Sequence, residues 1–237
     1  MSRRFRSVCA SFFAVLTLAL PAGSCQSPGD QTDLSRPSPP AAAAPLPARP
    51  AARPRIVVLG DSLTAGLGLS RDEAYPALLQ RRLDAGGYSY EVVNAGVSGD
   101  TSAGGLSRLE WSLDGDVRIL VVALGGNDGL RGLPVARMEQ NLAAIIDRAR
   151  QRHIAVVLAG METLTNMGPD YQREFHNAFP DLARRHRVAF LPFLLEGVAG
   201  RPELNQRDGI HPTAQGARII ADHLWPVLEP LLTATRR

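Results

Sequence analysis

Apolar residues follow two alternating patterns along residues 55–237. Five short apolar runs, each of which ends in a glycine or is followed by glycine or proline, have the length and the Val, Ile and Leu content of β-strands buried on both faces of a sheet. These runs are residues 55–60, 90–96, 118–124, 154–159 and 188–191. Between them, apolar side chains recur every three or four residues, as on the buried face of a helix. This spacing predicts helices over residues 75–85, 135–152, 171–185 and 214–232.

The alternation of strand and helix determines the expected fold. Strands joined through helices form a parallel sheet, with helices packed on both of its faces. We therefore expect an α/β fold, a three-layer α/β/α sandwich around a five-stranded parallel sheet. In such folds, ligands bind at the carboxyl ends of the strands. The residues that directly follow each strand are thus the first candidates for a functional site.

The start of the chain has a different composition. A short basic segment precedes a 13-residue apolar run over residues 8–20, and small residues follow before Cys25. This layout predicts a signal peptide over residues 1–24 and export to the bacterial cell envelope. The stretch Ala22-Gly23-Ser24-Cys25 is similar to a bacterial lipobox. It predicts a lipid-anchored protein that faces the periplasm, with lipid on Cys25; cleavage after Ser24 without lipid is the alternative.

Residues 25–54 contain mainly Pro, Ala, Ser and Arg and have little to bury. Burial in such a segment cannot offset the entropy lost on ordering, so we expect a disordered or polyproline-like tether. At up to ~3.1 Å per residue, it would span tens of Å between membrane and domain, or act only as a spacer. The remaining residues, 55–237, are expected to form one domain.

The distribution of charge argues against a nucleic-acid partner. The formal charge is +3 and the pI about 9.3, which by themselves favour a nucleic-acid or membrane partner. However, residues 1–54 hold six arginines and two acids, whereas residues 55–237 carry a net charge of −1. The basic character therefore belongs to the first 54 residues, and the part that is expected to fold is close to neutral. Two cysteines also exclude a disulfide-rich scaffold.

Polar and glycine-rich blocks follow the first three predicted strands. Gly60-Asp61-Ser62-Leu63 places a hydroxyl at the start of a turn or helix, where Asp or Ser more often serves only as an N-cap. After the second strand, Gly99 permits a close backbone approach to a ligand. After the third, Gly125-Gly126-Asn127-Asp128 offers the side-chain N–H donor of Asn127. Each block is weak evidence alone.

A fourth block, Asp208-Gly209-Ile210-His211-Pro212, lies near the C-terminus. A carboxylate and an imidazole three residues apart can share one side of a turn. Asp208 can then hold one ring nitrogen of His211 while the other nitrogen faces a nucleophile. Together the four blocks supply a hydroxyl, a base, an orienting acid and oxyanion donors at one edge of the sheet, which predicts acyl-transfer chemistry.

The four blocks resemble those of the SGNH, or GDSL, hydrolase family. Ser98-Gly99-Asp100-Thr101-Ser102 and Gly125-Gly126-Asn127-Asp128-Gly129-Leu130-Arg131-Gly132-Leu133 are also similar to its bacterial esterase/acyl-CoA thioesterase/lysophospholipase (arylesterase) branch. The resemblance covers residues 55–232. It implies the family's flavodoxin-like sandwich and a serine esterase that hydrolyses carboxylic esters or thioesters, lysophospholipids included, through an acyl-serine intermediate and without a cofactor.

The resemblance also implies a role for each matching residue. Ser62 would be the nucleophile, His211 the general base and then the acid, and Asp208 the residue that orients His211. The oxyanion hole would consist of the backbone N–H groups of Ser62 and Gly99 and the side chain of Asn127. These roles agree with the chemistry, because an unactivated serine is a poor nucleophile and needs an adjacent base.

The substrate is less constrained by the sequence. Met161, Leu164, Met167 and Phe193 are candidates for an acyl-binding groove, whereas Leu194 and Leu195 could equally pack in the core. A groove predicts higher activity on medium-chain esters than on acetyl esters. A steep preference for acetyl would instead indicate an O-acetylesterase of envelope glycans. In either case we expect a monomer that acts on a small-molecule ester.

Two further hypotheses come from other classes of protein. A non-catalytic envelope-binding lipoprotein on the same fold would lack one or more residues of the triad, and no such loss is visible in the sequence. A metal-dependent phosphoesterase would need several histidines at strand ends, and no metal site is expected. The histidines outside the triad are interpreted as surface or helix-flanking residues: His153, His176, His186 and His223. Asp61 and Asp128 are interpreted as turn-forming, and Asn94 as a brace for the Gly99 loop or a plain strand-end residue.

Overall fold

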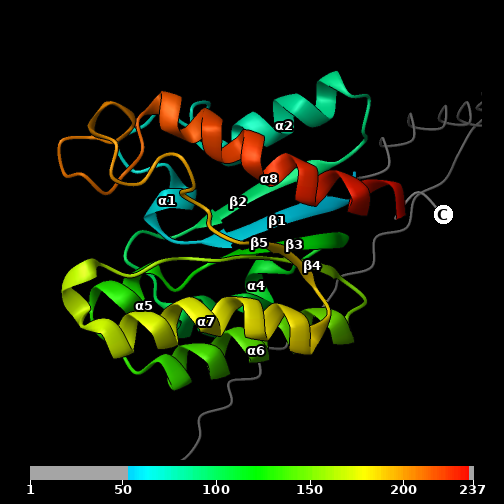
Figure 1. Ribbon diagram of the computed structural model, residues 1–237. Coiled ribbons are helices and arrows are strands. Elements are labelled where there is room, and N and C mark those ends of the chain that lie inside the picture. The colour runs from blue at the N-terminus through cyan, green and yellow to red at the C-terminus, as the bar shows by residue number, and fades with distance from the viewer. Residues whose placement is uncertain (1–52, 235–237) are drawn as a thin grey trace, which may run out of the picture. The chain divides into compact units, whose positions relative to one another are not determined.

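The computed structural model describes residues 53–234. The predicted signal peptide, Cys25 and all but the last two residues of the predicted tether lie outside the described residues. Strands and helices alternate as the apolar pattern predicts (Figure 1). The strands are β1 (Arg55–Gly60), β2 (Glu91–Gly96), β3 (Val117–Ala123), β4 (Ala155–Ala159) and β5 (Ala189–Leu191). The α-helices are α1 (Ser62–Ala65), α2 (Tyr75–Ala85), α3 (Ser102–Ser107), α4 (Leu109–Ser112), α5 (Gly126–Leu130), α6 (Val135–Gln151), α7 (Pro169–His186) and α8 (Ala214–Ala234), with 3₁₀ turns η1 (Thr165–Met167) and η2 (Pro202–Leu204).

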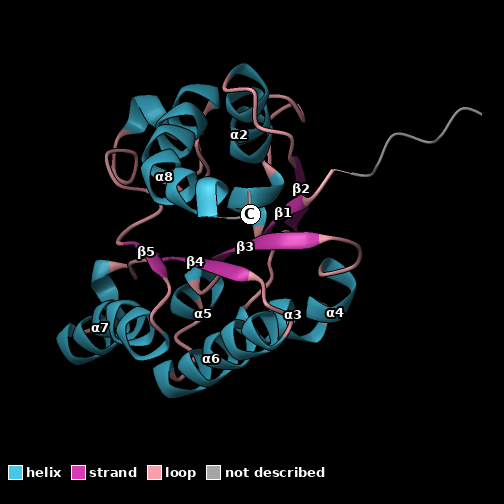
Figure 2. Cartoon of the chain, turned by 90° about the vertical axis from the view of Figure 1, so that its right-hand side faces the viewer, coloured by secondary structure: helices cyan, strands magenta, loops and turns pink. Residues whose placement is uncertain are grey.

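The five strands form one parallel sheet in the order β2-β1-β3-β4-β5. Helices α2 and α8 cover one face of the sheet, and α4, α5, α6 and α7 cover the other (Figure 2). The predicted α/β sandwich is thus confirmed. The chain leaves β1 toward β2 and returns to β3 on the opposite side, so the order reverses next to β1. A crevice for a ligand is expected at the carboxyl ends of the strands that flank such a reversal.

Burial of the strands depends on their position in the sheet. Every residue of the inner strand β1 after Arg55 is buried, and β3 and β4 are nearly as well covered. No residue of β2 is fully buried, and only Leu191 is buried in β5. The prediction that all five strands are buried on both faces is therefore wrong for β2 and β5. The sheet order makes these two strands the edges.

The longer helices bury the faces that their spacing predicts. In α6, Met138, Leu142, Ile145 and Ile146 are fully buried, and in α7 Phe175 is buried as well. Four short helices, α1, α3, α4 and α5, were not predicted as such, because four to six residues are too few to show a period. None of the helices in residues 53–234 combines the length and hydropathy that a bilayer-spanning helix needs.

Candidate active site

The turn after β1 presents Ser62 at the carboxyl edge of the sheet. A Cβ on Gly60 would lie 1.9 Å from Thr64 Oγ1, so glycine lets α1 begin directly at the end of the strand. Asp61 caps α1, because its Oδ1 accepts a hydrogen bond from Leu63 N at 3.0 Å. Ser62 is consequently the first residue of α1, and its backbone N–H has no partner within the helix.

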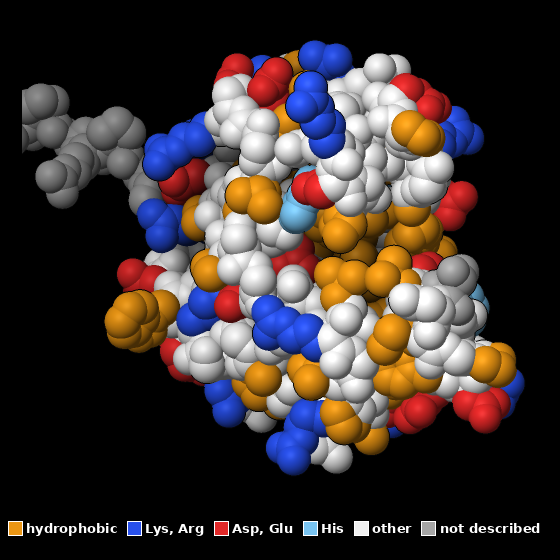
Figure 3. Space-filling model, turned by 90° about the vertical axis from the view of Figure 1, so that its left-hand side faces the viewer, with side chains coloured by type: hydrophobic (Ala, Val, Ile, Leu, Met, Phe, Trp, Pro, Cys, Tyr) orange, Lys and Arg blue, Asp and Glu red, His pale blue; other side chains and the backbone are white. Residues whose placement is uncertain are grey.

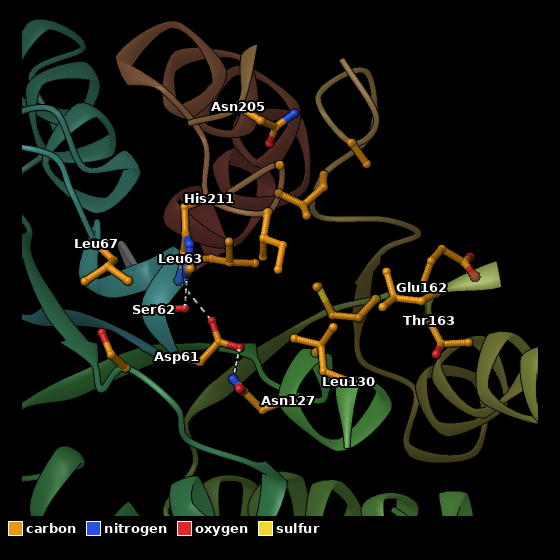
Figure 4. A pocket seen from close by; sticks show the side chains of 18 of the residues that line it. Asp61, Ser62, Leu63, Leu67, Asn127, Leu130, Glu162, Thr163, Asn205 and His211 are labelled. Carbon is orange, nitrogen blue, oxygen red and sulfur yellow. Dashed lines mark hydrogen bonds between the residues drawn. The ribbon is translucent and has the colours of Figure 1, made fainter. Parts of the chain in front are cut away.

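Two short hydrogen bonds run from Ser62 to His211 and from His211 to Asp208. Both residues lie about 150 positions after Ser62 in the sequence. Ser62 Oγ lies 2.8 Å from His211 Nε2 (Figure 4), and His211 Nδ1 lies 2.7 Å from Asp208 Oδ2. Asp208 Oδ1 also accepts hydrogen bonds from the backbone N–H groups of His211, at 3.0 Å, and Ile210, at 2.9 Å. The structure thus brings together the three residues of the predicted triad.

The hydrogen bonds around Asp208 determine which nitrogen of His211 carries the proton. The backbone N–H of His211, followed by its ring and the N–H of Ile210, holds the pKa of Asp208 well below its ordinary value. The carboxylate is therefore ionised at neutral pH, and it accepts a hydrogen bond from the N–H group at Nδ1 of His211. The lone pair of Nε2 then faces the Ser62 hydroxyl, which is the arrangement of a nucleophile with its base.

The loop that carries Asp208 and His211 is fixed at both ends. Gln206 N donates to His211 O at 2.7 Å, and Asn205 and Pro212 form an antiparallel bridge. The buried amide of Asn205 donates to Val198 O at 2.7 Å. These contacts close the loop into a short hairpin-like turn just before α8, which holds the imidazole over Ser62.

The three residues predicted to donate to the oxyanion, Ser62, Gly99 and Asn127, all line one cavity. Within residues 53–234, neither the backbone N–H of Ser62 nor that of Gly99 donates to a protein atom. Gly99 has a φ of +84°, a left-handed conformation that favours glycine. Next to it, Asp100 pairs with Arg108 at 2.6 Å, and Arg108 also donates to Gly60 O at 2.9 Å. The Gly99 loop is thereby tied to the end of β1.

Asp61 does more than form a turn. Its Oδ2 accepts a hydrogen bond from Asn127 Nδ2 at 3.0 Å, while Oδ1 accepts that of Leu63 (Figure 4). The side chain is almost completely buried, and this burial raises the pKa of Asp61 above its ordinary value. Because one N–H of the Asn127 amide is bound to Asp61, the other is free for a ligand. The spacing of Asp61 and Asn127 in the sequence gave no signal of this contact.

Asp128 and Asn94 brace neighbouring segments. The buried carboxylate of Asp128 accepts hydrogen bonds from Ser102 N at 2.7 Å and Ser102 Oγ at 2.6 Å, which joins α5 to α3. The hydrogen bonds of Asn94 do not reach Gly99. Its Nδ2 donates to Thr64 O at 2.8 Å and its Oδ1 accepts from Gly96 N at 3.0 Å, so Asn94 joins the end of β2 to α1.

A cavity of about 520 Å³ extends from Ser62 along the carboxyl ends of β3, β4 and β5. Figure 3 faces this end of the sheet and shows hydrophobic side chains gathered in the middle of the face, next to a histidine. Of the predicted groove residues, Met161, Leu164 and Phe193 line the cavity, and so does Leu195. Met167 is not among the lining residues and lies against Gly132, while Leu194 is fully buried in the core.

Other residues of the cavity were missed by the sequence analysis. Leu67, Leu130 and Ile210 line its mouth, with 42–47% of each residue exposed. They lie on three separate loops or helix ends, so no periodicity in the sequence relates them. A hydrophobic side chain that remains this exposed in three places around one opening is typical of a binding site for an apolar group.

The other histidines lie away from Ser62 or face carboxylates. His176 Nδ1 contacts Glu162 at 2.6 Å, and His186 Nδ1 contacts Asp147 at 3.0 Å. No group of three or more His, Cys, Asp or Glu side chains that could hold a metal ion occurs in residues 53–234.

Comparison with known proteins gives similar sequences with related names. Residues 58–219 match the GDSL-like Lipase/Acylhydrolase family. Esterase TesA of Pseudomonas aeruginosa is 44% identical over 183 residues, which cover 77% of this chain and 91% of the relative. Thioesterase 1/protease 1/lysophospholipase L1 of Escherichia coli is 39% identical over 185 residues, which cover 78% of this chain and 88% of the relative.

A solved structure supports the same relationship. The psychrotrophic esterase EstA from Pseudoalteromonas, in a structure inhibited by monoethylphosphonate, is 32% identical and superposes with a TM-score of 0.72. The match covers 76% of this chain and 98% of EstA. Phosphonates mimic the tetrahedral intermediate of acyl transfer on a serine. The similarity therefore extends from fold and sequence to a protein whose inhibitor is typical of serine hydrolases.

Proposed function

The chain belongs to the GDSL-like lipase/acylhydrolase family and is a serine ester hydrolase, and we propose that Ser62, His211 and Asp208 carry out its reaction. The observation that carries this proposal is the 2.8 Å contact between Ser62 Oγ and His211 Nε2. The proposal is also supported by the cavity, because Ser62, Gly99 and Asn127, which would donate to the oxyanion, line it together with His211.

In the first half of the proposed reaction, Ser62 Oγ attacks the carbonyl carbon of the ester while His211 Nε2 takes its proton. The negative charge that forms on the carbonyl oxygen accepts hydrogen bonds from Ser62 N, Gly99 N and Asn127 Nδ2. The tetrahedral intermediate collapses when the bond to the leaving oxygen or sulfur breaks. His211 gives its proton to that atom, and an alcohol or thiol leaves.

In the second half, water attacks the acyl-serine with His211 again as the base. The same donors stabilise the second oxyanion, and the carboxylic acid leaves as Ser62 recovers its proton. Asp208 remains ionised throughout and stabilises the imidazolium form of His211. The substrates proposed for this cycle are carboxylic esters and thioesters, including aryl esters and lysophospholipids, with the acyl chain in the cavity.

The assignment can be tested with Ser62→Ala and a fluorophosphonate probe. We expect the probe to label the wild-type enzyme and not the variant, and the hydrolysis of p-nitrophenyl esters to fall by about 10³-fold or more, since the nucleophile is lost. Ser98→Ala is a matched control, because Ser98 lines the same cavity and has no base. Near-normal activity of folded Ser62→Ala would contradict the proposal.

A series of p-nitrophenyl esters tests the acyl site. Rates should rise from acetyl to medium chains if the chain occupies the cavity beside Met161 and Phe193. A steep preference for acetyl would favour an O-acetylesterase. EDTA should leave the rates unchanged, since no step in the proposed reaction uses a metal.

We also propose that the enzyme is exported and held at the envelope by lipid on Cys25, and that it works as a monomer. The order of basic, apolar and small residues before Cys25 supports the anchor. The triad and the oxyanion donors all come from one chain, which supports a monomer as the active unit.

A further inference from the structure

The order of the strands gives the active site two distinct sides. Gly99 follows the edge strand β2, Ser62 follows β1, and Asn127 follows β3. The apolar part of the cavity continues past Asn127 to the ends of β4 and β5. In Figure 4, Leu130 and Thr163 accordingly lie on one side of Ser62 and Leu67 on the other.

This arrangement fixes the direction of a bound ester. If the carbonyl oxygen accepts from the three N–H donors and the acyl chain enters the apolar part, the leaving group must extend the opposite way from the carbonyl carbon. It then lies on the β2 side, next to the Gly99 loop. Side chains on that loop or against it are therefore the ones that the leaving group meets.

Arg131 contacts the Gly99 loop, although it comes from the chain segment that follows β3. It follows α5 directly, and its Nη2 donates to Gly99 O at 2.8 Å. Since a guanidinium has five N–H donors in a rigid plane, one bond to Gly99 leaves most of them available. The side chain is exposed to solvent and is not part of the wall of the cavity.

No carboxylate neutralises this guanidinium within residues 53–234, where Arg131 makes no ion pair. The two acids next to its contact points are engaged elsewhere. Asp100 pairs with Arg108 at 2.6 Å, and the carboxylate of Asp128 is buried against Ser102. Arg131 therefore holds a guanidinium that has no ion pair among the described residues against the Gly99 loop, the loop that the leaving group is inferred to meet.

We propose that Arg131 binds an anionic group of the leaving alcohol, a phosphate a few bonds from the ester oxygen. This inference rests on the proposed function and adds to it a residue that makes the enzyme prefer monoacyl phosphoglycerides to esters with an uncharged leaving group. Guanidinium and phosphate form paired, charge-assisted hydrogen bonds. In acyl-CoA thioesters the phosphates lie at the far end of the pantetheine arm, too far from the sulfur to reach Arg131 when the thioester is at Ser62.

The experiment compares two substrates that differ only in the phosphate: lauroyl lysophosphatidic acid and monolauroylglycerol, both below the concentration at which they aggregate. In Arg131→Gln, the amide can still donate to Gly99 O but carries no charge. We expect kcat/KM for the phosphate substrate to fall about 10–100-fold and that for the neutral substrate to change less than about three-fold. Arg131→Lys should retain most of the preference, because it keeps the charge.

Arg148→Gln serves as the control for net charge, since Arg148 is exposed on α6. This variant should leave kcat/KM unchanged for both substrates. The wild-type preference should also weaken at high ionic strength, where charge pairs are screened. An equal loss of kcat/KM on both substrates in Arg131→Gln would mean that Arg131 acts only through Gly99, and the inference would be wrong. No loss of kcat/KM on either substrate would overturn it as well.

The two proposals fail in different ways. If the fluorophosphonate probe does not label Ser62 and neither substrate is hydrolysed, the proposed function itself is wrong. If Ser62 is labelled and aryl esters are hydrolysed, but the ratio of phosphate to neutral substrate is the same in wild type and Arg131→Gln, only the role of Arg131 is wrong.

Discussion

At the scale of single residues, two aspartates near Ser62 have opposite environments. Asp208 is at the surface, and N–H donors lower its pKa, which keeps it ionised beside His211. Asp61 is buried, and desolvation raises its pKa, although Leu63 N and Asn127 donate hydrogen bonds to it. A buried carboxylate is costly unless such bonds satisfy it. The hydrogen bond from Asn127 indicates what this buried carboxylate does: it orients the Asn127 amide toward the site.

Asp61→Ala tests whether Asp61 orients Asn127. We expect kcat to fall about 10–100-fold, with a smaller change in KM, because an oxyanion donor acts mainly in the transition state. Asn127→Ala should lose about 10²–10³-fold. If Asp61 acts through Asn127, the double variant should be no slower than Asn127→Ala.

Additive losses in that double variant would show that Asp61 contributes by another route. The loss of the cap on α1 is expected to cost about 1 kcal/mol in the free energy of unfolding. Urea unfolding of the same variants separates this effect on stability from the effect on turnover.

At the scale of elements, the site depends on how closely α1 packs against β2. Gly96 ends β2, and a Cβ there would lie 2.2 Å from the backbone N of Ala65 and 2.8 Å from its Cα. Backbone atoms cannot move aside as a flexible side chain can. The absence of a side chain at Gly96 thus allows α1, which carries Ser62, to rest on the end of the edge strand.

Gly96→Ala is expected to lower the free energy of unfolding by about 1–3 kcal/mol, as overpacking does, and also to reduce kcat/KM, because α1 must shift. Gly87→Ala is the matched control. Gly87 has a φ of +70°, but nothing lies within 4 Å of a Cβ at that position. It should cost about 1–2 kcal/mol from backbone strain alone and leave kcat/KM unchanged. Full activity in Gly96→Ala would contradict this account.

At the scale of the whole molecule, the described domain contains every group that the proposed reaction uses. Its triad, oxyanion donors and cavity come from residues 61–211. The basic and proline-rich start of the chain contributes none of these groups. We therefore expect the start of the chain to decide where the enzyme works and not how fast.

Cys25→Ser tests this division in a bacterial host. The activity should move from the membrane fraction to the soluble periplasmic fraction, because a lipid chain and its membrane affinity are lost. The specific activity on a soluble aryl ester should stay the same. Cys9→Ser should change neither, since Cys9 leaves with the predicted signal peptide. Activity that remains in the membrane fraction of Cys25→Ser would contradict the anchor.

The sequence by itself determined the strands and the longer helices. It also indicated the kinds of residue that the proposed reaction uses: a serine, a histidine, an aspartate and N–H donors. Apolar periodicity acts over a few residues, so it locates elements such as β1 and α6. The pairing of Asp208 with His211 was also predictable, because both lie in one turn. The spacing of three residues is enough to set that contact.

Only the tertiary structure decided which residues from different strands and loops come into contact at the site. The order of the strands made β2 and β5 edges, placed Asp61 against Asn127 and brought Arg131 to Gly99. It also selected Leu195 for the cavity and left Met167 outside its lining. These contacts join residues about 30 or more positions apart, or choose among apolar residues that look alike in sequence. Local spacing carries no information about such choices, because they depend on which strands become neighbours.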